Sequence, residues 1–184
     1  MITPPGSDAG ETRSDVFRHP LEYIFADHDR QRIICAVLER LAGDFTAADA
    51  PDNAAHVLDH LENELPLHIA DEEINPFPML RLRCLPDDRI DEMLALLQGE
   101  HREDDAHCAA LLAPLRGIAA GGHPEDASEF AALARGFARF QRRLLGWENG
   151  TIPPLAGRRL TDADQIALGG SMAARRGMDP PELA

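Results

Sequence analysis

The sequence has few cysteines and no long apolar run, and each scarcity argues against a class of protein. Its apolar runs extend over only a few residues, whereas a membrane-spanning helix needs about 20. Cys35, Cys84 and Cys108 lie far apart and form no Cys-x-x-Cys motif, which argues against a disulfide framework and a zinc–thiolate site. Neither a glycine-rich phosphate loop after a strand nor a serine nucleophile elbow is present, so nucleotide binding and serine hydrolase chemistry are not indicated.

Positive charge is scarce as well. Lysine and arginine together number 18 against 32 aspartates and glutamates, so the 184-residue chain has a formal net charge of −14. Such an acidic surface repels phosphate, and neither nucleic acid nor an anionic membrane is an expected partner. The first 15 residues lack the basic start and apolar stretch of a signal peptide, which predicts a cytoplasmic location.

Strand patterns are absent, and helical patterns take their place. Aromatic residues make up only 5% of the chain, valine, isoleucine and threonine are sparse, and no segment alternates apolar and polar residues over the length of a strand. Alanine, leucine, arginine and the acidic residues abound, and apolar residues recur at helical spacing. Long helices are predicted at about residues 20–42, 52–74, 87–112 and 124–150, and a short one at 161–176. Thr161 and Asp164 have the spacing of a capping box at the start of the short helix.

Short connections between the long helices predict an all-α fold, an up-down-up-down four-helix bundle with a short C-terminal helix. Residues 16–176 would form this single domain, between a flexible N-terminal tail at 1–15 and a loose tail at 177–184.

Prolines are expected to shape these helices. Pro66 should kink the second helix just before His68, and Pro76 and Pro78 should break it. Residues 151–157 either continue the fourth helix or break it at their two prolines.

Each long helix places a metal-capable residue on its apolar stripe. These residues are His28 on the first, His68 and Glu72 on the second, His101 and Asp105 on the third, and Glu148 on the fourth. A buried carboxylate costs several kcal/mol unless it is paired or bound to a metal. Because all four long helices place such polar residues among buried ones, a cation shared between them is favoured. Taken singly, each histidine also fits a core imidazole bonded to a carboxylate, and Glu148 fits an ion pair with an arginine.

The spacing of these residues indicates the kind of metal. His68 and Glu72 are four residues apart, as are His101 and Asp105, so each pair projects from one helix face. A shell of nitrogen and carboxylate ligands without thiolate suits iron or manganese and, less specifically, zinc.

Other polar residues near the stripes are expected on solvated faces. Asp27 and Asp29 flank His28 and point about 100° away from it along a helix. His56 and His60 are four residues apart but fall beside the stripe of the second helix.

Four segments resemble the hemerythrin-like, or HHE cation-binding, domains. They are residues 25–30 (FADHDR), 67–73 (LHIADEE), 100–104 (EHRED) and 147–149 (WEN). The most specific part is His-x-x-x-Glu-Glu beginning at His68, followed by the proline-containing exit at residues 75–78. The resemblance covers residues 19–176 and implies a non-haem di-iron site. His28, His68 and His101 would then be terminal ligands, and Glu72 and Glu148 bridging carboxylates.

The chain departs from the family pattern at two positions. Most relatives carry His-x-x-x-Glu on the last helix, whereas the residue four before Glu148 is Leu144. Oxygen-carrying hemerythrins have a second histidine where this chain has Asp105. One of two metals would therefore lack protein ligands. Either water and Asp105 complete its coordination shell, or only one metal binds, or the site is degenerate and has lost its metal. This departure argues against reversible oxygen carriage.

The resemblance implies an iron-binding protein that senses or binds oxygen, nitric oxide or iron. The site would be a di-iron or a mononuclear iron site, and manganese and zinc are the other metals that it could bind. One alternative is a metal-free bundle that acts as an interaction module for a protein partner that the sequence does not identify. Another is a di-iron enzyme in defence against nitrosative or oxidative stress.

Overall fold

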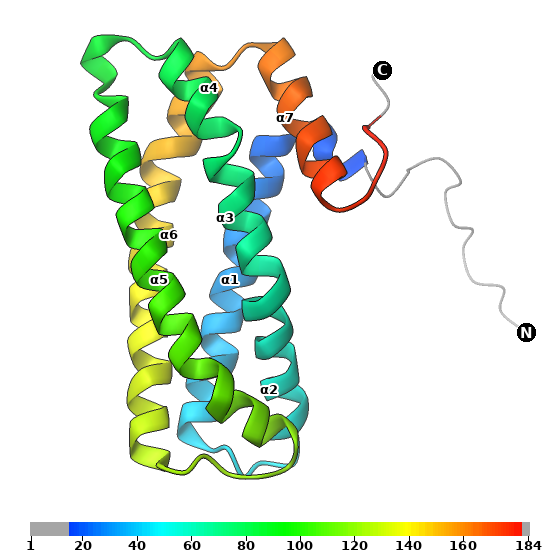
Figure 1. Cartoon of the computed structure of the whole chain (residues 1–184), viewed down its shortest axis with the longest axis vertical. Helices are drawn as coiled ribbons and strands as arrows, with labels where there is room; N and C mark the ends of the chain where they lie inside the picture. Colours follow the sequence, from blue (N-terminus) through cyan, green and yellow to red (C-terminus); the bar gives the residue numbers. More distant parts are fainter. Residues whose placement is uncertain (1–14, 182–184) are drawn as a thin grey trace, which may run out of the picture.

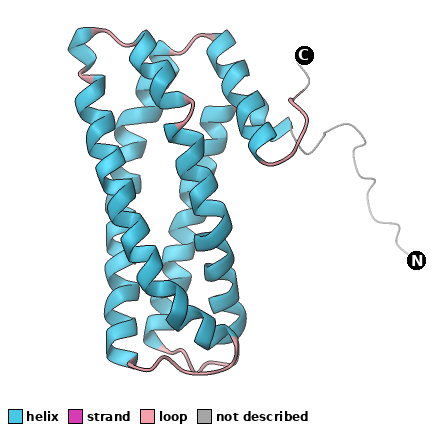
Figure 2. Ribbon diagram, viewed as in Figure 1, coloured by secondary structure: helices cyan, strands magenta, loops and turns pink. Residues whose placement is uncertain are grey.

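Four long helical segments lie side by side and alternate in direction in the computed structural model, which describes residues 15–181 (Figure 1). They are α1 (Pro20–Gly43), the continuous run of α2 (Ala50–Asp59), the π-turn η2 (His60–Glu64) and α3 (Leu65–Glu73), then α5 (Ile90–Ala119) and α6 (Ala127–Arg159). The described residues contain no strand (Figure 2). The predicted all-α bundle is confirmed.

The predicted short helix at the C-terminal end is α7 (Asp162–Arg175), which packs beside α1 and the 3-10 turn η1 (Asp15–Arg18). The hydroxyl of Thr161 accepts the backbone N–H of Asp164, and the carboxylate of Asp164 accepts the backbone N–H of Thr161. The capping box therefore forms as its spacing predicts.

An unpredicted helix, α4 (Pro76–Arg83), forms where a break was expected at Pro76 and Pro78. Both prolines fall in its first turn, where backbone N–H groups have no partner within the helix, so proline costs little there. The chain does turn at Ile74 and Asn75 before α4, and the 3-10 turn η3 (Pro86–Asp88) then leads into α5.

Pro66 widens its helix instead of ending it. Proline has no N–H to donate to the carbonyl of Glu62, four residues earlier, and its ring crowds that carbonyl. The backbone forms the π-turn η2, at whose end the Leu65 N–H bonds to the carbonyl of His60. The expected kink before His68 thus takes the form of a wide turn.

Helix α6 continues through Pro153 and Pro154 to Arg159, which answers the question that the sequence leaves open. Pro153 and Pro154 have no N–H to donate to the carbonyls of Asn149 and Gly150, yet the helix continues. The hydroxyl of Thr151 donates to the carbonyl of Trp147 at 2.8 Å. The ligand candidate Glu148 therefore lies in an unbroken helix.

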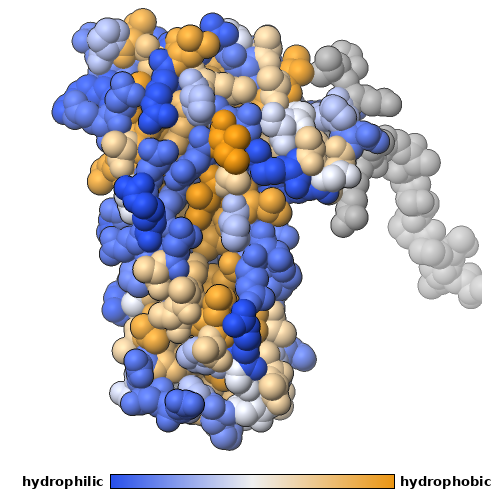
Figure 3. Space-filling model, viewed as in Figure 1, coloured by the Kyte–Doolittle hydropathy of each residue, from blue (hydrophilic) through white to orange (hydrophobic). Residues whose placement is uncertain are grey.

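Buried polar residues interrupt the apolar core. Along α5, His101 and Asp104 lie between Leu97 of one apolar cluster and Leu111 of another. Much of the face in Figure 3 is hydrophilic, and apolar side chains gather along the line between α5 and the α2–α3 segment. The polar residues inside the bundle are therefore surrounded by apolar packing.

Residues 1–14 and 182–184 lie outside the described residues, and with them almost all of the predicted N-terminal tail and the last three residues of the predicted C-terminal tail. Between residues 15 and 181, no helix combines the length and apolarity that crossing a membrane requires.

Candidate metal centre

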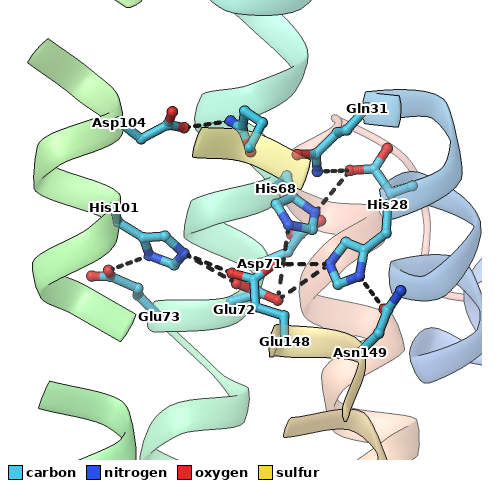
Figure 4. Close-up of polar contacts among 12 residues, drawn as sticks. His28, Gln31, His68, Asp71, Glu72, Glu73, His101, Asp104, Glu148 and Asn149 are labelled. Atoms are coloured by element: carbon cyan, nitrogen blue, oxygen red, sulfur yellow. Dashed lines mark hydrogen bonds and ion pairs between the residues drawn. The ribbon is translucent and has the colours of Figure 1, made fainter. Parts of the chain in front are cut away.

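Five side chains from the four long segments meet inside the bundle (Figure 4). His28 comes from α1, His68 and Glu72 from α3, His101 from α5 and Glu148 from α6. Their side chains are no more than 5% exposed. The structure therefore brings together all the predicted ligands except Asp105.

Around His28 and His68, the atoms that face the centre of this cluster lie too far apart for normal hydrogen bonds, which span about 2.7–3.2 Å. Nε2 of His28 is 3.7 Å from Oε1 of Glu72 and 3.6 Å from Oε2 of Glu148. Nε2 of His68 is 3.8 Å from Oε1 of Glu72. Ligand atoms of these four residues nonetheless all lie within 4.8 Å of one another.

Four of these buried atoms have no hydrogen-bond partner within residues 15–181. They are Nε2 of His28 and His68, and Oε2 of Glu72 and Glu148. An unpaired polar atom is costly in a protein interior, so a cation between these side chains would offset that cost. The donor set thus fits a metal ion.

Each carboxylate presents one oxygen to either side of the cluster. Glu72 directs Oε1 to His28 and His68, and Oε2 to His101 at 3.4 Å. Glu148 directs Oε2 to His28, and Oε1 to His101 at 3.3 Å. Two imidazoles and two carboxylate oxygens therefore face one side, and one imidazole and two carboxylate oxygens face the other.

The second nitrogen of each imidazole is held by a short hydrogen bond to an oxygen on a neighbouring helix. The Nδ1 contacts are His28 with Asn149 at 2.5 Å, His68 with Asp27 at 2.8 Å and His101 with Glu73 at 2.7 Å. Such bonds fix the orientation of a ring and direct its other nitrogen toward a metal.

None of these three supporting residues was predicted from the sequence, and the prediction that Asp27 lies on a solvated face was wrong. Asp27 is buried, and Arg30 and Gln31 donate further hydrogen bonds to its carboxylate. The usable signal was adjacency, because Asp27, Glu73 and Asn149 each lie next to a ligand in the chain. Each supports a ligand on another helix, which the sequence does not show.

The buried carboxylates change the protonation of the metal-free site. Burial opposes a charge on His68, but Glu72 and Asp27 outweigh it and raise the pKa of His68 to about 9. Burial likewise opposes a charge on His101, whereas its contacts with Glu148 and Glu72 raise its pKa to about 11. Burial would raise the pKa of Glu72, but the neighbouring histidines hold it well below its usual range. Two imidazolium groups therefore balance the carboxylates.

Asp105 does not join the site, which corrects the prediction for this residue. Its side chain is exposed, and Asp104 is the buried residue of the pair. Buried positions on α5 alternate between steps of four and three residues, so the step of four from Leu97 to His101 is followed by a step of three to Asp104. Burial raises the pKa of Asp104 to about 7, and Gln141 donates a hydrogen bond to it at 2.7 Å.

Leu144 provides no ligand near His101. It is 3% exposed and belongs to the apolar cluster that contains Phe77 and Leu97. The Phe77 ring stacks on the His101 ring, with centroids 6.4 Å apart. The side of the site with one imidazole therefore has apolar neighbours.

The model of the hemerythrin HHE cation-binding domain matches residues 19–155. The chain belongs to the hemerythrin family. The match extends from α1 through most of α6 and includes all five residues of the candidate metal centre, whereas α7 lies outside it. No curated protein and no solved structure shows significant similarity to the chain.

Proposed function

We propose that this hemerythrin-like chain binds iron through His28, His68, His101, Glu72 and Glu148. The observation that carries the proposal is the contrast between the two nitrogens of each imidazole. The outward nitrogens have contacts of 2.5–2.8 Å, whereas the inward nitrogens have only contacts of 3.3–3.8 Å with the carboxylates. Manganese and zinc are the other metals that this ligand set suits.

Two adjacent ions fit the arrangement of the carboxylates. His28 and His68 would hold one ion, His101 would hold the other, and Glu72 and Glu148 would each offer one oxygen to either ion. The ion near His101 has the fewest protein ligands, so a solvent molecule or a small ligand would complete its coordination.

Ferrous iron with an open coordination position binds small diatomic molecules such as oxygen and nitric oxide. Phe77 and Leu144 supply an apolar wall near His101, and such a wall limits the access of water. We therefore favour sensing or capture of a diatomic ligand over reversible oxygen carriage. A role in stress defence and a cytoplasmic location remain predictions from the sequence.

The first experiment is elemental analysis of chain purified without chelator from iron-replete cells. About two irons per chain are expected for the bridged site, and about one would restrict binding to the side of His28 and His68. Absence of iron, even after anaerobic loading with iron(II), would contradict the proposal. Reduced, iron-loaded protein should also change its absorption spectrum on addition of nitric oxide.

The variant His68→Ala tests whether these residues hold the metal. A metal that binds only the folded state raises Tm, so chelator should lower the Tm of the native chain by several degrees. The difference between loaded and chelated protein should largely disappear in His68→Ala. It should persist in the control His123→Ala, because His123 is exposed and lies outside the cluster.

A metal-free bundle is the second candidate, and the protonation of the site favours it. Protonated His68 and His101 balance the buried carboxylates, so the fold does not require a cation at neutral pH. This candidate predicts that chelator leaves the Tm of the native chain unchanged.

A further inference from the structure

A cavity of about 190 Å³ lies between α1 and the wide turn η2. Its polar lining consists of Asp27, Arg30, His56, Asp59, His60 and Glu64. The five candidate ligands are almost completely buried, so a cation that reaches them must pass through the protein. This cavity leads from the surface to a residue that is bonded to one of them.

Asp27 is that residue. Its Oδ2 atom lies 2.8 Å from Nδ1 of His68, and its Oδ1 atom accepts a hydrogen bond from Arg30 at 2.6 Å. The carboxylate thus has one oxygen toward the ligand His68 and the other toward Arg30 at the cavity. Asp27 thus connects the cavity lining to His68, whose other ring nitrogen faces the proposed metal site.

His60 lines the same cavity and has no partner. It was predicted to lie on a solvated face, but it is only 7% exposed, and its imidazole makes no hydrogen bond or ion pair within residues 15–181. Burial lowers the pKa of His60 to about 4, so its imidazole is neutral at pH 7 and keeps a lone pair for a cation. Such an imidazole belongs to the same class of ligand as those of the main site.

The charges around the cavity favour cations over anions. Asp59 and Glu64 are exposed carboxylates of its lining, and Arg30 is the single arginine of the lining. The guanidinium of Arg30 is held by Asp27 and lies over the Tyr23 ring, 5.1 Å from its centroid. An acidic entrance in a chain of net charge −14 raises the local concentration of divalent cations.

We propose that this cavity is the entry site for the divalent metal ion, with Asp59 and Glu64 attracting the ion and His60 as its first buried ligand. The site lies at the π-turn, because the buried His60 begins η2 and Glu64, at the end of the same turn, lines the cavity with it. The inference rests on the proposed metal binding, and it concerns the rate of loading instead of the final occupancy.

The test measures cobalt(II) uptake by the full-length, chelator-stripped chain, followed by stopped-flow absorbance of the bound ion. The final amount of cobalt per chain tests the proposed function, and the rate of uptake tests the entry site. His60→Leu should slow uptake about tenfold or more and leave the final amount unchanged. The exposed control His123→Leu should load at the native rate.

A second variant removes the negative charge of the entrance without changing the buried residues. Asp59→Asn with Glu64→Gln should slow uptake several-fold and weaken its dependence on ionic strength. The control Asp52→Asn with Glu103→Gln changes the net charge equally at exposed positions outside the cavity.

Native rates in His60→Leu, with native final occupancy, would overturn the entry site and leave the proposed function intact. Should His60→Leu fail to fold by circular dichroism, equal rates in the two double variants would overturn it. A native chain that takes up no cobalt would contradict the metal binding on which the inference rests.

Discussion

At the scale of single residues, each histidine of the centre uses its two nitrogens differently. Nδ1 bonds to an oxygen on another helix, and Nε2 faces the carboxylates at a distance that suits an intervening ion (Figure 4). These bonds link the helices, because each supporting residue follows or precedes one ligand in the chain and bonds to another. Asp27, next to His28, bonds to His68, and Asn149, next to Glu148, bonds to His28. The site is thus oriented before any metal binds.

Metal affinity should rise with pH. In metal-free protein the pKa values of His68 and His101 are raised to about 9 and 11, so protons compete with the metal at pH 7. Raising the pH from 6 to 8 removes part of this competition. Titration against a chromophoric chelator at pH 6, 7 and 8 should show tighter binding at each step. An affinity independent of pH would contradict protonated histidines.

Asp104→Asn should stabilise the metal-free chain above neutral pH. The folded-state pKa of Asp104 is about 7, above its ordinary value, so ionisation of this carboxyl lowers the free energy of unfolding. The loss is absent below about pH 4, grows as the pH rises, and is complete above pH 7. The gain should therefore grow from pH 4 to 8, toward an upper limit on the order of 4 kcal/mol. Urea unfolding of chelated protein measures it. The exposed neighbour supplies the control, because Asp105→Asn should show no such gain.

At the scale of elements, prolines and glycines set the local geometry. Pro66 produces the wide turn that begins at His60, whereas Pro76 begins a helix. Gly169 allows α7 to approach η1, because a Cβ at this position would lie 2.1 Å from the carbonyl oxygen of Phe17. Next to it, a Cβ on Gly170 would meet nothing within 4 Å.

These two adjacent glycines should respond oppositely to alanine. Gly169→Ala should lower the unfolding free energy by about 1–3 kcal/mol, because η1 and α7 must separate. Gly170→Ala should raise it by up to about 1 kcal/mol, since alanine is the better helix former. Thermal unfolding of both variants and of the native chain measures these changes. Equal effects would contradict the close approach of Gly169 to Phe17.

At the scale of the whole molecule, apolar packing extends along the bundle around the polar centre. Apolar clusters along all four long segments surround this centre, and raised imidazole pKa values place positive charge beside its carboxylates in the metal-free chain. Arg175 and Arg176 join α7 to the bundle through Asp71, each at 2.8 Å. We therefore expect the bundle to fold without a metal, and a bound metal to add stability to it.

Removal of metal should lower Tm without unfolding the chain at 25 °C. Chelated protein should keep the helical far-ultraviolet circular dichroism of the loaded protein, because the apolar packing remains. Loss of the helical signal on chelation would show instead that metal binding and folding are one event.

The sequence by itself determined the four long helices and the short C-terminal one, their alternating arrangement and five residues of the centre, because the period of an apolar stripe is a local property that each segment carries alone. Only the tertiary structure decided which neighbour faces inward. Asp104 and Asp105 differ by one step on a helix, and the packing of α5 against its neighbours selects Asp104. The burial of Asp27 and His60 likewise depends on the helices that pack beside them. Such choices depend on contacts between segments, which no single segment of the sequence contains.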